Sequence, residues 1–142
     1  MNNVWKIATG LVFLLILVAG CQDSEKLKRD QYYSEGYQLY TVYCANCHQT
    51  DGKGMANLYP PILPSLKSYT KNELICTIKN GMKGELVVAG KTYNRPMPAN
   101  PKLADIEIAE IVTYMYNTWG EETNYTPIDS VTAALNACSV KP

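Results

Sequence analysis

Cys44-Ala45-Asn46-Cys47-His48 is the stretch of this sequence that decides the fold. It places two cysteines three positions apart and a histidine directly after the second one. On one turn of helix the two thiols face the same way, and each can add to a haem vinyl group while the imidazole lies beneath the iron. The spacing is therefore typical of covalent attachment of c-type haem. His48 is the only histidine in the chain, so a second axial ligand must be another residue type.

Two other uses of this cysteine pair stay open on the residues alone. A structural zinc site needs about four ligands, and the later cysteines, Cys76 and Cys138, are single and far apart in the sequence. A thioredoxin-like redox pair normally lies beside a βαβ pattern, and no strand-rich repeat flanks this pair. Haem attachment is the better interpretation of the motif.

The first twenty residues have the pattern of a lipoprotein signal peptide. Lys6 precedes an apolar run from Ile7 to Val18, which is short for a membrane-spanning helix and fits a signal-peptide core. The run ends in Leu17-Val18-Ala19-Gly20-Cys21, which resembles a bacterial lipobox. Cleavage would leave a lipidated Cys21, and two acyl chains suffice for stable anchoring. We therefore expect an extracytoplasmic, membrane-anchored lipoprotein; the alternative is an ordinary signal peptide with a chance cysteine.

Length and charge limit the domain count and the partners. The 142 residues divide into a signal peptide (1–20), a lipidated cysteine and tether (21–33), one domain (34–120) and a C-terminal extension (121–142). Thirteen basic residues balance thirteen acidic ones. This balance argues against nucleic acid as a partner, because binding of phosphates needs an excess of basic side chains.

Two cysteines are left over after lipidation and haem attachment are assigned. Cys76 and Cys138 would lie in an oxidising compartment, which favours a disulfide between them. Such a cross-link would close a long loop and stabilise the fold by on the order of 4 kcal/mol in the chain-entropy model. The alternative is two buried free thiols that pack as small apolar groups.

Residues at three- and four-residue spacing predict three main helices. The first begins near Ser34 and runs into the haem motif. The second covers residues 70–81, where Thr70 and Glu73 form a capping box. The third covers residues 104–119. One face of the first helix is made of small, apolar or aromatic residues: Gly36, Leu39, Tyr40 and Tyr43.

Prolines and glycines punctuate the segments between these helices. Pro60, Pro61 and Pro64 follow the haem motif and predict a loop that excludes a helix through the next stretch. Residues 84–93 favour a short hairpin with its turn at Gly90. The C-terminal extension has the composition of a polar tail, with one short helix expected near residues 131–136.

The expected mature chain has four methionines that are candidates for the second axial ligand: Met55, Met82, Met97 and Met115. Met115 has helical core spacing, and Met55 follows the motif too closely to reach the opposite face. Met82 lies just past a helix end and stays an alternative. Met97 is favoured because Pro96-Met97-Pro98 forms a stiff loop, and a rigidly held ligand loses little conformational entropy. A lysine ligand or an open site are further alternatives.

The ordered motifs of residues 34–120 resemble a class I c-type cytochrome of the bacterial, membrane-tethered kind. Gly36 and Tyr40 match the small and aromatic positions of that family's N-terminal helix, and Ile111 and Tyr114 match the positions of its C-terminal helix. The resemblance implies that the two helices cross at Gly36. It also implies the fold class, a small all-α bundle around one covalently bound haem.

The same resemblance implies roles around the haem. Pro60 lies twelve residues after His48 and matches the proline whose carbonyl receives the proton of the second ring nitrogen. That bond would fix the tautomer and raise the basicity of the ligand. Pro96-Met97-Pro98 resembles the family's axial-methionine loop. The spare pair Cys76 and Cys138 and the extension after residue 120 depart from the minimal family domain, which leaves the role of the extension open.

These expectations define a function without catalytic residues. His–Met ligation saturates the iron, so a protein of this kind carries single electrons between respiratory redox proteins and is not an enzyme. The first alternative is a haem-based sensor of a small ligand, and the second is a dedicated electron-transfer subunit of a larger oxidase or reductase. Surface lysines could steer a partner, although each could equally be ordinary solvated surface; the candidates are Lys53, Lys67, Lys79, Lys83 and Lys91.

Overall fold

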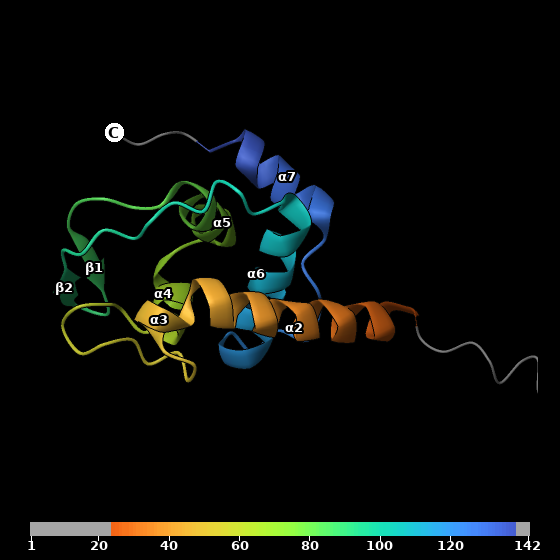
Figure 1. Cartoon of the computed structure of the whole chain (residues 1–142), viewed down its shortest axis with the longest axis horizontal. Coiled ribbons are helices and arrows are strands. Elements are labelled where there is room, and N and C mark those ends of the chain that lie inside the picture. The colour runs from red at the N-terminus through yellow and green to blue at the C-terminus, as the bar shows by residue number, and fades with distance from the viewer. Residues whose placement is uncertain (1–23, 139–142) are drawn as a thin grey trace, which may run out of the picture.

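The computed structural model describes residues 24–138, so the expected signal peptide, Cys21 and residues 139–142 lie outside the described residues. Within that range the chain forms helices and one small antiparallel sheet, arranged as Figure 1 shows. The elements in chain order are α2 (Ser24–Tyr43), α3 (Ala45–His48), α4 (Ile62–Ser68), α5 (Lys71–Asn80), β1 (Leu86–Val88), β2 (Lys91–Tyr93), α6 (Asp105–Trp119) and α7 (Ile128–Asn136).

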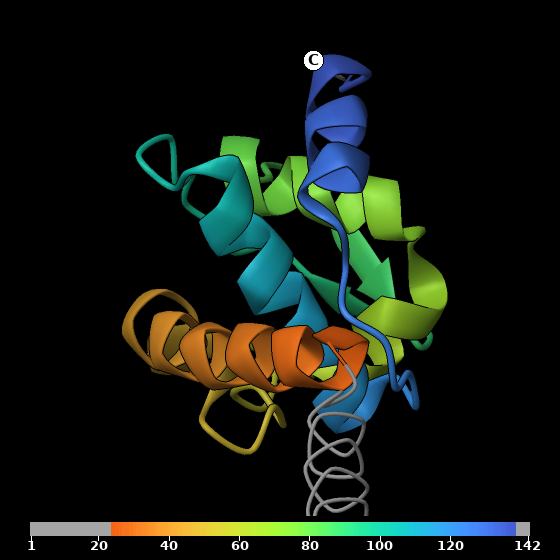
Figure 2. The same cartoon turned by 90° about the vertical axis from the view of Figure 1, so that its right-hand side faces the viewer.

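Helices α2 and α6 cross at Gly36, as the sequence predicts. Figures 1 and 2 show α2 lying across one end of α6 and α7 at its other end. A Cβ atom at Gly36 would lie 2.6 Å from the carbonyl carbon of Glu110 and 2.8 Å from Cβ of Tyr114, and it would overlap the Glu110 carbonyl oxygen. Only glycine lets the two backbones approach this closely, which explains why a poor helix former lies inside α2.

Aromatic side chains fill the space on either side of the crossing. The rings of Tyr40 and Tyr114 are 5.3 Å apart, and Trp119 lies 5.2 Å from Tyr40 and 5.4 Å from Tyr114. Tyr40 is almost fully buried, and its hydroxyl donates to the Gln49 carbonyl at 2.8 Å. Such tilted aromatic pairs stabilise beyond the area that they bury, so the cluster fixes the end of α2 that leads into the haem motif.

Helix α2 begins earlier than the sequence predicts, at Ser24 instead of near Ser34, so most of the expected tether is helical. The cause is a tertiary contact that polar sequence does not reveal. Tyr32 is buried, and its ring lies 5.1 Å from that of Tyr125 in the C-terminal extension. Lys28 Nζ lies 4.8 Å from the Tyr125 ring, within the range of a cation–π contact. At the other end of the helix, Tyr43 is exposed and does not share the buried face as predicted.

Helix α4 shows that the prediction of a continuous loop after the haem motif is wrong. Pro61 occupies the N-cap position with extended backbone, and Pro64 falls in the first helical turn. Backbone N–H groups of the first turn have no acceptor inside their own helix, so a proline there removes no hydrogen bond. The Ser65 hydroxyl also donates to the Pro61 carbonyl at 2.9 Å. The prolines therefore start this helix and do not prevent it.

The predictions for residues 70–93 are confirmed. Helix α5 starts with the expected capping box, in which the Thr70 side chain accepts from the Glu73 N–H and the Glu73 carboxylate accepts from the Thr70 N–H at 2.9 Å. Strands β1 and β2 form an antiparallel hairpin that pairs Leu86 with Tyr93. Gly90 provides the turn with a φ of 76°, a conformation that glycine adopts without steric cost.

The C-terminal extension packs onto the domain and completes its core. The Thr126 N–H donates to the buried Thr113 hydroxyl at 2.8 Å, and Val131 of α7 is fully buried. Cys76 of α5 and Cys138 are joined by a disulfide, with Cα atoms 5.7 Å apart, which is the pairing that the sequence favours. Among residues 24–138 no helix has both the length and the apolar character needed to cross a membrane.

Replacing Gly36 by alanine tests the helix crossing. Alanine is the better helix former by about 1 kcal/mol, but its Cβ overlaps α6, so we expect a net loss of about 2 kcal/mol in the free energy of unfolding. Urea unfolding of the haem-loaded protein measures this loss. Gln38→Ala, at an exposed position of the same helix, is the matched control and should change stability by less than about 0.5 kcal/mol. Equal effects of the two substitutions would contradict the crossing.

Candidate haem-binding site

A pocket opens between α3, α4, α5, the β-hairpin and the loop after it. It contains about 930 Å³ of space, including its open mouth, near the upper end of the usual range for ligand sites. The walls are largely apolar and aromatic, with few polar groups. The lining residues are Tyr40, Cys44, Cys47, His48, Tyr59, Pro60, Ile62, Ser65, Tyr69, Leu74, Thr77, Ile78, Met82, Gly84, Leu86, Arg95, Pro96, Met97, Pro98 and Met115.

The haem motif forms one side of this pocket. The Cys44 N–H donates to the Tyr40 carbonyl at 2.8 Å and the His48 N–H donates to the Cys44 carbonyl at 2.9 Å, so helical bonding continues from α2 into α3. The described cysteines outside the disulfide are Cys44, which is buried, and Cys47, which is half-buried. Burial raises the pKa of the Cys44 thiol to about 12, so this thiol is protonated at neutral pH. Both side chains face the pocket, as covalent attachment to one ligand requires.

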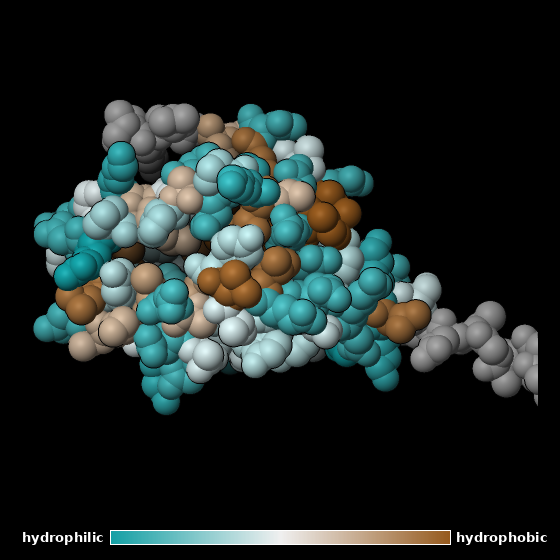
Figure 3. Space-filling view, in the orientation of Figure 1, coloured by the Kyte–Doolittle hydropathy of each residue, from teal (hydrophilic) through white to brown (hydrophobic). Residues whose placement is uncertain are grey.

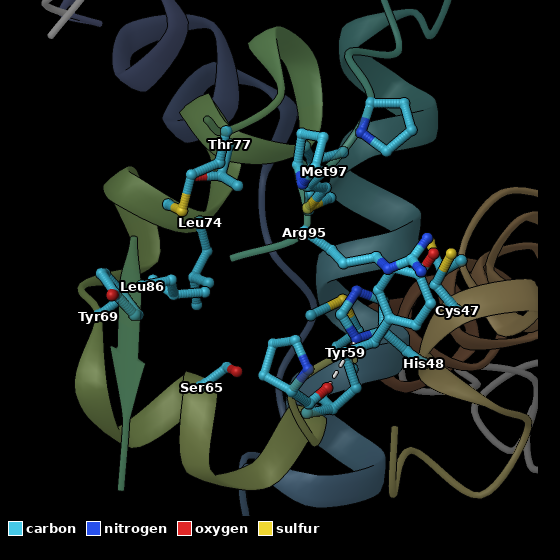
Figure 4. A pocket seen from close by; sticks show the side chains of 18 of the residues that line it. Cys47, His48, Tyr59, Ser65, Tyr69, Leu74, Thr77, Leu86, Arg95 and Met97 are labelled. Atoms are coloured by element: carbon cyan, nitrogen blue, oxygen red, sulfur yellow. Dashed lines mark hydrogen bonds between the residues drawn. The ribbon is translucent and has the colours of Figure 1, made fainter. Parts of the chain in front are cut away.

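His48 is held in one orientation by the carbonyl predicted for it. Its Nδ1 lies 2.9 Å from the Pro60 carbonyl oxygen, so Nδ1 carries the proton and Nε2 keeps a free lone pair. Burial lowers the pKa of His48, which keeps the ring neutral. Figure 4 shows the bond between the ring and the Pro60 carbonyl at the pocket wall. A neutral imidazole with a free Nε2 is the form that binds a metal.

Gly54 brings the Pro60 carbonyl within reach of His48. Its N–H donates to the His48 carbonyl at 2.9 Å, and its φ of 68° reverses the chain beneath the histidine. A Cβ at this position would lie 2.7 Å from the Pro60 carbonyl oxygen, so a larger residue would push that acceptor away. The sequence marks this glycine only as loop punctuation, and its role depends on the folded loop.

Met97 lies on the side of the pocket opposite His48, as Figure 4 shows. Its loop is fixed by a pair of backbone hydrogen bonds with Met82, at 3.0 Å and 2.9 Å. Met82 and Met115 also line the pocket, whereas Met55 does not. Met115 is a buried core residue of α6. The structure therefore brings Met97 and Met82 together and leaves both as thioether donors facing the pocket.

The residues present fit a covalently bound haem. Two thiols and a neutral imidazole face one side, a thioether faces the other, and the space between them has apolar walls. When bound, haem supplies an iron that changes by one electron. The zinc alternative has no such support, since residues 24–138 include no group of three or more His, Cys, Asp or Glu side chains placed to hold a metal ion.

Arg95 is a pocket residue that the sequence analysis did not single out. It is the only side chain with a full charge among the lining residues, and no ion pair with a described carboxylate is seen. Figure 4 shows its side chain extending from the Met97 loop toward Cys47. Haem carries two propionate carboxylates, and a guanidinium matches the geometry of a carboxylate. Its position two residues before Met97 is the signal that could have identified it.

Comparison with known proteins agrees with this geometry. The family model of cytochrome c matches residues 33–119. Cytochrome c-552 of Thermus thermophilus is 30% identical over 93 residues, which are 62% of this chain and 70% of that protein; for a second Thermus thermophilus protein of the same name the last share is 62%. The cytochrome c subunit of alcohol dehydrogenase (quinone) from Gluconacetobacter polyoxogenes is 30% identical over 109 residues, 70% of this chain but 21% of that subunit.

The helix crossing, the pocket and its donors define a haem protein, and the chain belongs to the cytochrome c family. It is a class I c-type cytochrome with a cytochrome c-like helical fold and a covalently bound haem c. Proteins of this family are electron carriers and generally not enzymes. The expected family, fold class and cofactor are thereby confirmed.

Replacing Arg95 by glutamine tests its role beside the haem. A nearby cation stabilises the reduced form, which has one positive charge fewer, so its loss should lower the reduction potential. We expect a decrease of about 40 mV, roughly 1 kcal/mol for one electron. Spectroelectrochemical titration of the haem-loaded protein measures the potential. Arg95→Lys keeps the charge and should recover most of the decrease, and an unchanged potential in Arg95→Gln would remove the assignment.

Proposed function

We propose that this protein is a one-electron carrier in which Cys44 and Cys47 hold a single haem and His48 and Met97 are its axial ligands. It transfers electrons between respiratory redox partners on the outer side of a bacterial membrane, to which a lipidated Cys21 attaches it. The observation that carries the proposal is the neutral imidazole of His48, fixed by Pro60, across an apolar pocket from a thioether.

The chemistry of this donor set favours electron transfer over catalysis. A histidine and a methionine together leave no open position on the iron for a substrate, and methionine raises the reduction potential. Both side chains come from fixed backbone: α3 continues the hydrogen bonds of α2, and the Met97 loop is paired with Met82. Because neither ligand has to move, the change of charge needs little rearrangement of the protein.

Replacing Met97 by alanine tests the ligand assignment. The wild-type haem should be low-spin and should not bind carbon monoxide in its reduced form, because both axial positions are filled. Met97→Ala should bind carbon monoxide readily and should have a lower reduction potential. Absorption spectra of oxidised and reduced protein, with and without carbon monoxide, measure both properties.

Met82→Ala is the matched control, since Met82 lies beside Met97 and faces the same pocket. It should keep the wild-type spectrum. If Met82→Ala bound carbon monoxide and Met97→Ala did not, Met82 would be the ligand. If the wild-type protein itself bound carbon monoxide readily, the saturated carrier would be excluded and the alternative, a haem-based sensor of small ligands, would be favoured.

The proposed anchor would hold the domain close to the membrane. Helix α2 begins at Ser24, so Asp23 and Gln22 are the only residues between Cys21 and the first helical residue. Two residues extend the chain by roughly 7 Å. The haem motif follows the far end of α2, which is about 30 Å long at 1.5 Å per residue. A partner that exchanges electrons with this haem would then lie near the membrane surface.

Replacing Cys21 by alanine tests the anchor. With no thiol to lipidate, the haem-containing protein should move from the membrane fraction to the soluble fraction of cells that express the full sequence. Haem staining of the two fractions after gel electrophoresis measures the distribution. Asp23→Ala leaves the lipobox intact and should stay with the membrane. A Cys21→Ala protein that remains in the membrane fraction would rule out this anchor.

The surface supports a small and transient contact with redox partners more than a permanent interface. Figure 3 shows apolar side chains in separate patches among hydrophilic ones on the face in view. Three of the lysines proposed for steering already bind their own chain: Lys53 pairs with Asp51, Lys79 donates to the Leu103 carbonyl, and Lys91 donates to the Ala56 carbonyl. The exposed Lys67 and Lys83 are the better candidates for steering.

The second candidate function is that of a fixed electron-transfer subunit. It is favoured by the similarity to a protein named as the cytochrome c subunit of a quinone alcohol dehydrogenase. The size of the protein in a mild detergent extract separates the two functions. A free carrier runs as a single small haem protein, whereas a subunit runs with a larger oxidoreductase.

A further inference from the structure

The role of the C-terminal extension, which the sequence leaves open, follows from what α7 contacts. Val131 and Ala134 of α7 are buried in the core, and the Thr132 hydroxyl donates to the Asp105 carboxylate at 2.5 Å at the start of α6. The Cys76–Cys138 disulfide ties the end of the extension to α5. The extension is therefore attached to two helices by a covalent bond, a hydrogen bond and apolar packing.

Helix α5 lies between this extension and the haem pocket. Leu74, Thr77 and Ile78 line the pocket. At 3.6 residues per turn, Cys76 projects from the opposite side of the helix, where the disulfide holds it to the extension. Figure 1 shows α5 with α7 on one side and the hairpin and α4 on the other. A shift of α7 would therefore reach the pocket through α5.

The far end of α5 holds the loop that carries Met97. The Asn100 side chain donates to the Ile78 carbonyl and its backbone N–H to the Lys79 carbonyl, both at 3.1 Å. Lys79 Nζ donates to the carbonyl oxygens of Pro101 at 3.1 Å and of Leu103 at 2.6 Å. These four bonds join α5 to the segment that follows Met97.

Steric contact adds to this attachment directly at Met97. A Cβ at Gly81, the residue after α5, would lie 2.6 Å from the Met97 carbonyl oxygen, so the two backbones are in contact there. Met82, the next residue, exchanges two backbone hydrogen bonds with Met97. The Met97 loop has no secondary structure of its own apart from this bridge. Its position is therefore only as fixed as the end of α5.

We propose that α7 and the Cys76–Cys138 disulfide form a brace that keeps α5 in place and so holds Met97 over the haem. The inference rests on the proposed ligation by Met97. The physical reason is that α5 has ten residues and a helix of this length is not stable alone. The extension and its cross-link supply the missing constraint, and the residues of the brace act through α5 without touching the haem.

The test measures how often Met97 leaves the iron. Imidazole binds a His–Met ferric haem only after the methionine has left, so its limiting binding rate at high concentration reports the opening of the site. The double variant Cys76→Ser, Cys138→Ser should raise this rate by about tenfold, the factor that a loss of 1.4 kcal/mol produces. Stopped-flow absorption of the haem-loaded full chain measures the rate.

Two further variants separate a brace from general stability. Gly36→Ala weakens the α2–α6 crossing, which is remote from α5, and should raise the imidazole rate far less than the double variant at a similar loss of stability in urea. Val131→Ala keeps the disulfide but removes buried volume from α7, and it should raise the rate as well. Val131→Ala also keeps the test possible if the double variant does not fold.

The outcomes for the brace and for the ligand are distinct. If wild-type reduced protein binds carbon monoxide readily, Met97 is not a ligand and the proposed function fails together with the brace. If the wild-type iron is saturated but the double variant and Val131→Ala bind imidazole at the wild-type rate, or no faster than Gly36→Ala, the brace alone is overturned. A selective increase in both brace variants supports it.

Discussion

The close approach of α2 and α6 at Gly36 is the constraint on which the rest of the structure depends. Because α2 continues by backbone hydrogen bonds into the haem motif, the crossing determines where the two thiols and the imidazole of that motif face. The same α6 supplies Met115 to the pocket wall. Aromatic packing by Tyr40, Tyr114 and Trp119 then removes the remaining freedom of the junction. One glycine thus sets the distance between the two helices that carry the core and the site.

An apolar pocket that holds a metal-binding imidazole must satisfy the second nitrogen of that ring. The Pro60 carbonyl does this at 2.9 Å, and burial keeps the ring neutral. The positive φ of Gly54 makes this contact possible, because it turns the loop back beneath the histidine. At the mouth the only full charge is that of Arg95, which suits the carboxylates of a haem better than it suits an empty apolar cavity.

The extension after Gly120 connects parts of the molecule that the minimal domain leaves apart. Tyr125 packs on Tyr32 and stabilises the first turns of α2, while α7 closes the other end of α6 and is linked to α5 by the disulfide. The same segment thus bears on the start of the chain's first described helix and on the helix that supports Met97. This dual contact explains why a polar tail contributes fully buried residues such as Val131.

The sequence by itself determined what depends on local spacing: the Cys44–His48 motif, the Thr70–Glu73 capping box, the turn at Gly90, and the family with its fold class and cofactor. Only the tertiary structure decided the start of α2 at Ser24 and the depth to which α7 is buried, because both depend on contacts between distant segments such as Tyr32 and Tyr125. Helix α4 and Arg95 needed the fold for a similar reason. A proline is harmless only at a first turn whose position is known, and a surface arginine becomes a pocket residue only when its loop closes over the haem motif.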